Sequence, residues 1–546
     1  MRSSPKRPLP RKPAPKADVR SSEPVPPPGP PTAFYAWLRE HGWEALAALV
    51  VLAAAVLRFY NLPLAPLHHD EGVNGNFLTI LFRSGLYHYD PANYHGPSLY
   101  YLALPIVAFN TLLFGKAGLS TAAIRALPAV FGTATVYLTL QFRHYLGRWG
   151  AFTAAALLAF SPGALYFSRY FIHETLFVFF TLAVVFSWLR YRDTQRPSFL
   201  WALAASLALL FTTKETAVLS LVVAILAYLC AAAWLHLRRA DPEGGSKADK
   251  VGDRGAPAGP AGGEGRLQRA MPWLALALFA GIYVLLYSSF GTYFRGVYDS
   301  LITFRYWFKT GVDTMLYGRV TYLRWLRREE WLLLFSGAAA FGWALYRARN
   351  RFALFAGFWA AGMLAAYSLI PYKTPWLALN ILLPLALVAG YGMEEVATVL
   401  RSRRRGWQAL CGLLAVAALS VPAYHAIDIS FVRYDDDSVV YVYAHTQRQF
   451  LSLVRKVEDM AALYGTGSGT HITITSPEYW PLPWYLRNYP NAGYWGKIVP
   501  TSEPIIIGRD YQAAELQASL GKDYQWVGSY DLRPGVGLVL FCRRLP

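Results

Sequence analysis

The sequence predicts an all-α polytopic membrane protein with about 11–13 transmembrane helices, followed by a small C-terminal α/β domain. Of its 546 residues, 55% are hydrophobic and only 16% are charged, whereas soluble proteins carry about a quarter charged residues. Apolar runs of roughly 17–25 residues, the length that crosses a bilayer, recur as far as residue 424. Residues 425–546 then change to shorter apolar runs between polar stretches.

The N-terminal segment, residues 1–39, is rich in proline, lysine and arginine. This composition is typical of a disordered cytoplasmic tail, because it has too few apolar side chains to build a core. A secretory signal is not expected, since no short apolar core and cleavage site directly follow the basic stretch. The run from Trp43 to Tyr60 is the first predicted crossing, and it begins the transmembrane domain predicted over residues 40–424.

The formal charge of +19 is carried largely by this tail and by short connections such as "RHYLGR", "RYRDTQR", "YRARNR" and "RSRRR". Basic residues in short loops mark the cytoplasmic side of a membrane protein. They form no basic face interleaved with base-stacking aromatic residues, so a nucleic-acid partner is excluded. The three cysteines lie far apart and predict neither a disulfide framework nor a zinc site.

Two apolar runs, near 98–115 and 120–142, would cross the membrane twice, whereas the loops on either side of them predict an odd number of crossings. If residues 67–97 are external and Arg143–Arg148 cytoplasmic, the chain must cross an odd number of times between them. Either 98–115 lies partly in the outer leaflet, or one basic loop breaks the rule; we expect the former, which gives about 11 crossings. Further apolar runs lie near 150–168, 171–190, 198–212, 215–236, 271–290, 331–346, 352–370, 376–397 and 407–424.

Two other segments of the predicted membrane domain differ from their surroundings. Residues 237–270 are rich in glycine, proline and charge, which predicts a flexible cytoplasmic loop. In residues 291–330 aromatic side chains alternate with arginines, which is typical of an interfacial helix or loop. This second segment is either an anchoring aromatic belt or a lid over a lipid phosphate.

In residues 425–546 the stretches "HITITSP", "PIIIGRD" and "GLVLFCRR" predict strands, and "DYQAAELQASLG" predicts a helix. These elements predict a small α/β domain. The parity of the crossings places this domain on the extracytoplasmic side of a plasma or inner membrane, and the N-terminus in the cytoplasm.

Titratable residues concentrate where predicted crossings meet the external face, beginning with "LHHDEGVNGNF" at residues 67–77. Ionisable groups at a bilayer boundary are costly unless they are paired or functional. The set is Asp70, Glu71, His95, Arg169, His173, Glu174, Lys214, Glu215 and Lys373. Carboxylates together with lysines and an arginine suit an anionic phosphate substrate and a reaction that needs a base.

Each member of the set also has an ordinary structural interpretation. Asp70 and Glu71 are then a solvated loop pair, and the two lysines extend from helix ends to the interface. His173-Glu174 then caps a helix, and His95 is a loop histidine before a helix opened by proline. These interpretations must all hold on the same face, which is less probable than one shared site.

The order and spacing of several motifs resemble those of the GT-C glycosyltransferases. The motifs are "HHDEG", "YHGPSLYYL", "AIRALPAVFGT", "LAFSPGALYFSRYFIHETLFVFF", "FTTKETA" and "IPYKTPWLALNILLPLAL". The chain is most similar to the branch of the dolichyl-phosphate-mannose–protein mannosyltransferases and the lipid A aminoarabinose transferase, and within it to a flippase-activity-associated subgroup. The resemblance covers about residues 40–400, and "SPEYWPLPWYLRNYP" in the C-terminal domain is similar to that subgroup.

The resemblance implies transfer of a sugar from a polyprenyl-phosphate-linked donor to an unknown protein, lipid or glycan acceptor on the external face. Asp70 is the implied general base or acceptor-orienting carboxylate, with Glu71 supporting it. Lys214 and Lys373 fall on the lysines that meet the carrier phosphate. The candidate substrate-binding residues are His69, His95, Arg169, His173, Glu174, Lys214 and Lys373.

One departure from the family pattern is His95-Gly96-Pro97, which stands where the family often has Glu-Lys-Pro or His-Pro-Pro. The sequence identifies no certain cofactor, and the polyprenyl-phosphate sugar is expected as the donor substrate. Whether a divalent cation is bound by Asp70, His95 or Glu174 is left open, because their spacing is not a recognised metal motif. A lipid-linked sugar flippase and a non-catalytic component of an envelope polysaccharide system are the alternative functions.

Overall fold

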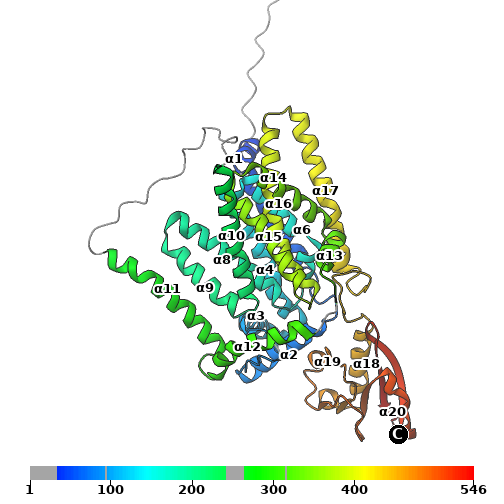
Figure 1. Ribbon diagram of the computed structural model, residues 1–546. Helices are drawn as coiled ribbons and strands as arrows, with labels where there is room; N and C mark the ends of the chain where they lie inside the picture. The colour runs from blue at the N-terminus through cyan, green and yellow to red at the C-terminus, as the bar shows by residue number, and fades with distance from the viewer. Residues whose placement is uncertain (1–32, 93–94, 241–263, 314–316, 546) are drawn as a thin grey trace, which may run out of the picture. The chain divides into compact units, whose positions relative to one another are not determined.

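The computed structural model describes residues 33–92, 95–240, 264–313 and 317–545 (Figure 1). The chain divides into two compact units, Met1–Leu46 and Ala47–Pro546, and the site described below lies entirely in the second. Of the predicted tail and the predicted glycine-rich loop, residues 1–32 and 241–263 lie outside the described residues.

Long helices dominate the second unit (Figure 1). The helices before the C-terminal domain are α1 (Ala33–Phe59), α2 (His69–Ser84), α3 (Ser98–Phe114), α4 (Thr121–Leu140), α5 (Arg143–Leu146), α6 (Arg148–Phe160), α7 (Pro162–Phe167), α8 (Glu174–Thr194), α9 (Pro197–Phe211), α10 (Ala217–Ala240), α11 (Glu264–Tyr287), α12 (Arg295–Asp313), α13 (Thr321–Glu329), α14 (Trp331–Arg347), α15 (Arg351–Leu369), α16 (Leu379–Arg401) and α17 (Arg405–Phe431). Within the described part of the chain, nine are long and apolar enough to cross a membrane. The predicted number is higher because it includes the shorter helices α6, α9 and α14.

Helix α16 lies in the centre of the membrane domain. Every residue from Leu379 to Tyr391 is buried, as expected for a helix that is apolar on all sides. Its Gly390 faces Gly150 of α6, and a side chain at Gly150 would bring a Cβ within 2.9 Å of the Gly390 carbonyl oxygen. Small residues at such positions allow two helix backbones to approach closely in a membrane.

Helix α3 begins and ends on the same face of the membrane domain. At its start, the Ser98 amide donates to the carbonyl of Thr212, at the end of α9. Just beyond its end, Leu119 and Thr121 accept hydrogen bonds from Arg487 and Trp484 of the C-terminal domain. Helix α3 is itself long and apolar enough to cross a membrane, so the expectation that residues 98–115 do not complete a crossing stays a prediction.

The C-terminal domain follows α17, which continues to Phe431, past the predicted boundary at residue 425. Its elements are α18 (Phe450–Leu463), β1 (Ile472–Ile474), α19 (Leu482–Tyr485), β2 (Ala492–Tyr494), β3 (Ile505–Arg509), α20 (Ala513–Leu520), β4 (Tyr524–Arg533) and β5 (Val536–Arg543). The sheet order is β2-β1-β3-β5-β4. Strands β1, β2 and β3 run parallel, and β5 pairs antiparallel with β3 and β4.

The predicted strands correspond to β1, β3 and β5, and the predicted helix to α20. Strands β2 and β4 were not expected. They are the two edges of the sheet, and β4 is interrupted by register shifts at Trp526/Gly528 and Asp531/Arg533. An edge strand has little need of a continuous apolar pattern, so its sequence signal is weak.

Helix α19 joins the C-terminal domain to α2. The Leu67 amide donates to the Tyr485 hydroxyl at 2.9 Å, and Trp484 packs against Gly75, where an added Cβ would lie 2.6 Å from the indole ring. Trp484 is buried and its indole N–H donates to the Thr121 hydroxyl at 3.2 Å. We call the side of the membrane domain that carries this contact the domain face.

Candidate active site

The start of α2 positions the two neighbouring carboxylates. His68 precedes the helix and its Nδ1 accepts a hydrogen bond from the Asp70 amide at 3.1 Å. The Glu71 carboxylate in turn accepts from the His68 amide at 2.9 Å, which completes a reciprocal cap. The positive end of the helix dipole also favours negative charge in this first turn.

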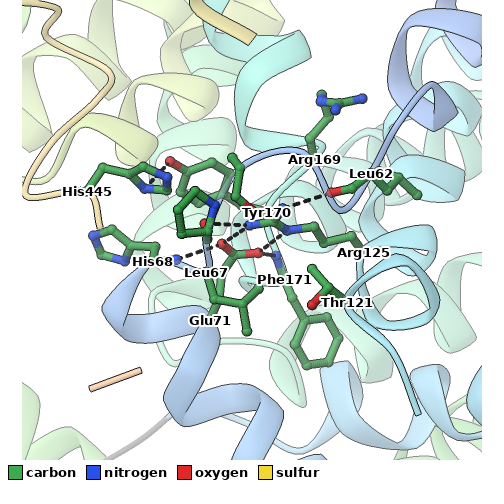
Figure 2. A network of polar contacts seen from close by, with 12 residues as sticks. Leu62, Leu67, His68, Glu71, Thr121, Arg125, Arg169, Tyr170, Phe171 and His445 are labelled. Carbon is green, nitrogen blue, oxygen red and sulfur yellow. Dashed lines mark hydrogen bonds and ion pairs between the residues drawn. The ribbon is translucent and has the colours of Figure 1, made fainter. Parts of the chain in front are cut away.

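Glu71 points into the protein and forms the centre of a buried polar network (Figure 2). Arg125 of α4 donates to both of its carboxylate oxygens at 2.7 Å, and the Phe171 amide donates to it at 2.8 Å. Arg125 also donates to three carbonyls of the connection that leads into α2: Leu62, Ala65 and Pro66. The network therefore fixes the path of the chain immediately before Asp70.

The same network extends to the connection between α17 and α18. Figure 2 shows His445 beside His68 and Tyr170. His445 is buried, its Nδ1 lies 2.8 Å from the Tyr170 hydroxyl, and its ring stacks on that of His68 with centroids 6.0 Å apart. Residues from the membrane domain and from the start of the C-terminal domain thus support the start of α2.

Asp70 lines a cavity of about 420 Å³ on the domain face. The walls come from the start of α2, the α7–α8 turn, the α9–α10 turn and the connection between α15 and α16. Its titratable lining residues are His69, Asp70, His95, His173, Glu174, Lys214, Glu215, Tyr367 and Tyr372. Segments far apart in sequence therefore bring three carboxylates, three histidines and a lysine to one cavity.

Two acid–base pairs are formed within this cavity. Lys214 donates to Glu174, and both side chains are buried. His95 Nδ1 lies 2.9 Å from the Glu215 carboxylate. Burial raises the pKa of Glu215, but the charges of His95 and Lys214 outweigh burial and lower that pKa to about 2, so Glu215 is ionised at neutral pH.

Asp70 forms no ion pair with any described residue, in contrast to Glu174 and Glu215. The neighbouring His173 is buried with its Nε2 3.1 Å from the Gly96 carbonyl, a contact that requires a protonated Nε2. Burial, together with the charges of His95 and Lys214, holds the pKa of His173 well below its usual value. This imidazole is therefore neutral and acts as a donor to the backbone.

The structure places six of the predicted site residues together in the cavity lining: His69, Asp70, His95, His173, Glu174 and Lys214. The other three have different surroundings. Glu71 belongs to the Arg125 network. Arg169 donates to the carbonyls of Leu57, Arg58, Tyr60 and Asn61, which hold the end of α1.

Lys373 is also outside the cavity lining. Its ammonium donates to the carbonyls of Tyr367, Ser368 and Ile370, where α15 ends. The lysine thus fixes a turn whose residues Ile370, Tyr372 and Thr374 do line the cavity. Its contact with the site is indirect.

Two arginines near the site were not expected from the sequence. Arg125, within the motif "AIRALP", could have been predicted, because a charged residue inside an apolar helix usually has a partner or a function. Arg533 of β4 could not: it lies 3.3 Å from His69 Nδ1 and forms no ion pair with a described residue. Burial is the main cause that lowers the pKa of His69 to about 4, with the Arg533 and His68 charges adding to it against that of Asp70.

The residues of the cavity do not fit a divalent cation. Of the three candidate ligands, His95 is engaged with Glu215 and Glu174 with Lys214. Throughout the described parts of the chain, no three histidine, cysteine, aspartate or glutamate side chains are grouped to hold a metal ion.

Comparison with solved structures identifies the fold. ArnT from Cupriavidus metallidurans, crystallised with undecaprenyl phosphate, has a TM-score of 0.57 and 16% identity over 92% of this chain and 98% of that one. Its apo form gives the same TM-score at 15% identity. The archaeal oligosaccharyltransferase AglB from Archaeoglobus fulgidus, in complex with an inhibitory peptide and a dolichol-phosphate, has a TM-score of 0.50 and 12% identity over 87% of this chain and 70% of that one.

Sequence comparison adds one further match. Residues 96–241, which include His173, Glu174 and Lys214, match the profile of the family described as dolichyl-phosphate-mannose-protein mannosyltransferase. A comparison with curated proteins gives no match. The chain is therefore a multi-pass membrane protein with the fold of ArnT, and it carries a segment of the mannosyltransferase family's sequence pattern across its candidate site.

Proposed function

We propose that this chain is a membrane glycosyltransferase that moves a sugar from a polyprenyl-phosphate-linked donor to an acceptor on the extracytoplasmic face. The observation that carries the proposal is the cavity on the domain face, where Asp70 is the carboxylate without an ion pair beside two formed acid–base pairs. The fold shared with ArnT, a structure solved with undecaprenyl phosphate, supports the choice of donor.

In the proposed reaction an acceptor hydroxyl attacks the anomeric carbon of the donor sugar. Asp70 accepts the hydroxyl proton while the new carbon–oxygen bond forms, a contribution of about 10²–10⁴-fold for a well-placed base. The bond between the anomeric carbon and the phosphate oxygen breaks, and polyprenyl phosphate leaves with the bonding electrons. The protonated Asp70 then returns its proton to solvent.

Negative charge grows on the departing phosphate, and cations fixed nearby stabilise the transition state more than the ground state. We assign this role to Lys214. His95, which Glu215 holds at 2.9 Å, is proposed to donate a hydrogen bond to the phosphate. Arg533 adds positive charge beside His69. Glu71, Arg169 and Lys373 are proposed as positioning residues, because their partners fix the connections that form the cavity walls.

Among glycosyltransferases of the mannosyltransferase and aminoarabinose-transferase branch, we place the chain nearest to the flippase-activity-associated subgroup. The order of motifs supports this, as does "SPEYWPLPWYLRNYP" at residues 476–490. This stretch contains α19, the helix that contacts α2 beside the cavity.

The direct test incubates purified full-length protein with a polyprenyl-phosphate sugar and measures released polyprenyl phosphate. Asp70→Asn is expected to reduce release by at least about 10²-fold, because the amide cannot accept the proton. Asp437→Asn, which removes an exposed carboxylate in the α17–α18 connection, serves as the matched control and should leave release unchanged.

Equal activity of Asp70→Asn and wild type would refute the assignment of the base. Protein that moves the intact lipid-linked sugar across a vesicle bilayer without releasing polyprenyl phosphate would instead be a flippase. Absence of both activities would favour a non-catalytic component of an envelope polysaccharide system.

A further inference from the structure

A second cavity, of about 470 Å³, lies on the face of the membrane domain opposite the domain face. It is bounded by the end of α8, the middle of α10, the start of α15 and the second half of α16. The end of α4 marks the same face, since Tyr145 just beyond it donates to Asp193 at the end of α8. None of the proposed catalytic residues lines this cavity.

The cavity is rich in arginine set against aromatic rings. The Arg351 guanidinium lies 4.5 Å from the centre of the Tyr228 ring, and Arg192 lies 5.4 Å from the Trp188 ring. These two rings contact each other edge to face at 5.0 Å. Arginines held over aromatic faces have a preferred orientation, so binding an anion costs them less conformational entropy.

The positive charge of the cavity is not balanced by its own carboxylates. Arg349 and Arg351 form no ion pair with any described residue. Asp193 balances Arg192 at 3.0 Å. Glu395, the carboxylate in the lining, accepts a hydrogen bond at 3.1 Å from the Trp343 indole N–H rather than from an arginine.

The start of α15 points toward the same space. Asn350 caps this 19-residue helix by accepting from the Ala353 amide at 2.9 Å. The Asn350 side-chain amide donates to the Tyr145 carbonyl at 3.1 Å, which fixes the turn between α14 and α15. A fixed helix N-terminus attracts phosphate through its dipole, and it adds to the attraction of the two unpaired arginines.

Apolar surface continues from the cavity along α10. Leu226 and Leu229, on either side of Tyr228 in sequence, are 54% and 55% exposed. They belong to α10, which is one of the described helices long and apolar enough to span a membrane. Acyl chains would cover such side chains in a bilayer. A free phosphate ion would leave them uncovered, whereas a phospholipid would use both the charged cavity and the apolar surface.

We propose that this cavity binds the phosphate head group of an anionic membrane lipid, with Arg349 and Arg351 as the phosphate ligands and α10 as the surface for its acyl chains. An ordinary solvated cluster of basic residues would lack the aromatic rings of Trp188 and Tyr228, which line this cavity beside the arginines. The proposal is independent of the glycosyltransferase activity.

The test titrates detergent-purified full-length protein with dioleoyl-phosphatidylglycerol and, separately, dioleoyl-phosphatidylcholine, and counts bound lipid by native mass spectrometry. Wild type is expected to bind phosphatidylglycerol more tightly than phosphatidylcholine. Arg349→Ala with Arg351→Ala should weaken phosphatidylglycerol binding by at least about tenfold. The control pair Arg403→Ala with Arg405→Ala removes the same charge from the exposed α16–α17 turn and should retain wild-type binding.

Equal losses in the two double variants would overturn the proposal, because they would show diffuse attraction to surface charge. Equal affinity for the two lipids would overturn it as well. Displacement of bound lipid by excess inorganic phosphate would show that the cavity selects a free anion and would overturn the lipid assignment. If the alanine pair does not yield a monodisperse protein, Arg349→Gln with Arg351→Gln tests the same expectation.

Discussion

At the scale of single residues, Asp70 and Glu71 are adjacent in the first turn of α2, but their side chains point to different surroundings. Successive side chains on an α-helix point about 100° apart. Asp70 therefore lines the cavity while Glu71 is completely buried against Arg125. Their neighbourhood was predictable from "HHDEG", but the direction of each side chain was not, because the partner Arg125 belongs to a helix formed later in the chain.

The Lys214–Glu174 pair tests whether a buried ion pair serves stability or activity. Lys214→Ala leaves a buried carboxylate uncompensated, which is expected to cost about 3–5 kcal/mol of unfolding free energy. Lys214→Met combined with Glu174→Gln removes both charges and should recover most of that loss. Thermal unfolding of the detergent-purified variants measures these differences.

Release of polyprenyl phosphate should separate the two roles. The double variant is expected to stay inactive despite its recovered stability, because it lacks the cation that faces the leaving phosphate. A stable double variant with wild-type release would show that the pair is only structural, and the assignment of Lys214 would then be wrong.

At the scale of elements, the junction of α13 and α14 contains a buried carboxylate that opposes folding at neutral pH. Glu330 accepts from the Ser161 hydroxyl at 2.8 Å and from the Gly163 amide at 2.7 Å. Burial raises the pKa of Glu330 from 4.5 to about 7, against these hydrogen bonds. Since the folded-state pKa is raised, the contribution of this acid to stability is full below pH 4.5 and is lost as pH rises toward 7.

Glu330→Gln keeps an oxygen acceptor for both donors and removes the titration. The unfolding free energy of wild type relative to this variant should therefore fall by about 3 kcal/mol as pH rises through this interval. Melting temperatures of the two proteins across the range measure the difference. Parallel curves would mean that Glu330 does not titrate there.

The contact between α2 and α19 depends on the absence of a side chain at Gly75. Gly75→Ala would place a Cβ 2.6 Å from the buried Trp484 ring, and the strain should cost about 1–3 kcal/mol. Faster proteolysis between the membrane domain and the C-terminal domain is the expected readout. Gly412→Ala on α17, where no atom lies within 4 Å of the added Cβ, is the control and should be neutral or stabilising.

At the scale of the whole molecule, the proposed orientation is tested by cysteine labelling. In a background without Cys230, Cys411 and Cys542, a membrane-impermeant maleimide should label Asp437→Cys in intact cells. Arg403→Cys, on the opposite face, should react only after the membrane is opened. The reverse pattern would place the proposed active site in the cytoplasm and would contradict the proposed function.

Much of this architecture could be predicted from the sequence, because long apolar runs indicate membrane helices. The site could be predicted as well, because charged residues gather at the ends of these helices. The number of crossings was harder to predict, since α3 has the length and composition of a span, whereas basic loops predict an odd number of crossings between residues 97 and 143. The surroundings of Lys373 were not predictable either, because a lysine at a helix end can donate to backbone carbonyls as readily as to a substrate. Arg533 was beyond prediction, because its place beside His69 depends on how a separate domain docks.

The hydrogen bond from Leu67 to Tyr485 joins residues 418 positions apart, which has a consequence for biosynthesis. During translation, the segment that presents Asp70 emerges early but must wait for nearly the whole polypeptide before its final contacts form. Contacts of such long sequence separation form slowly, and chains interrupted upstream of α19 never acquire them. Premature release from the ribosome should thus yield protein that is inserted in the membrane but lacks this contact before the start of α2.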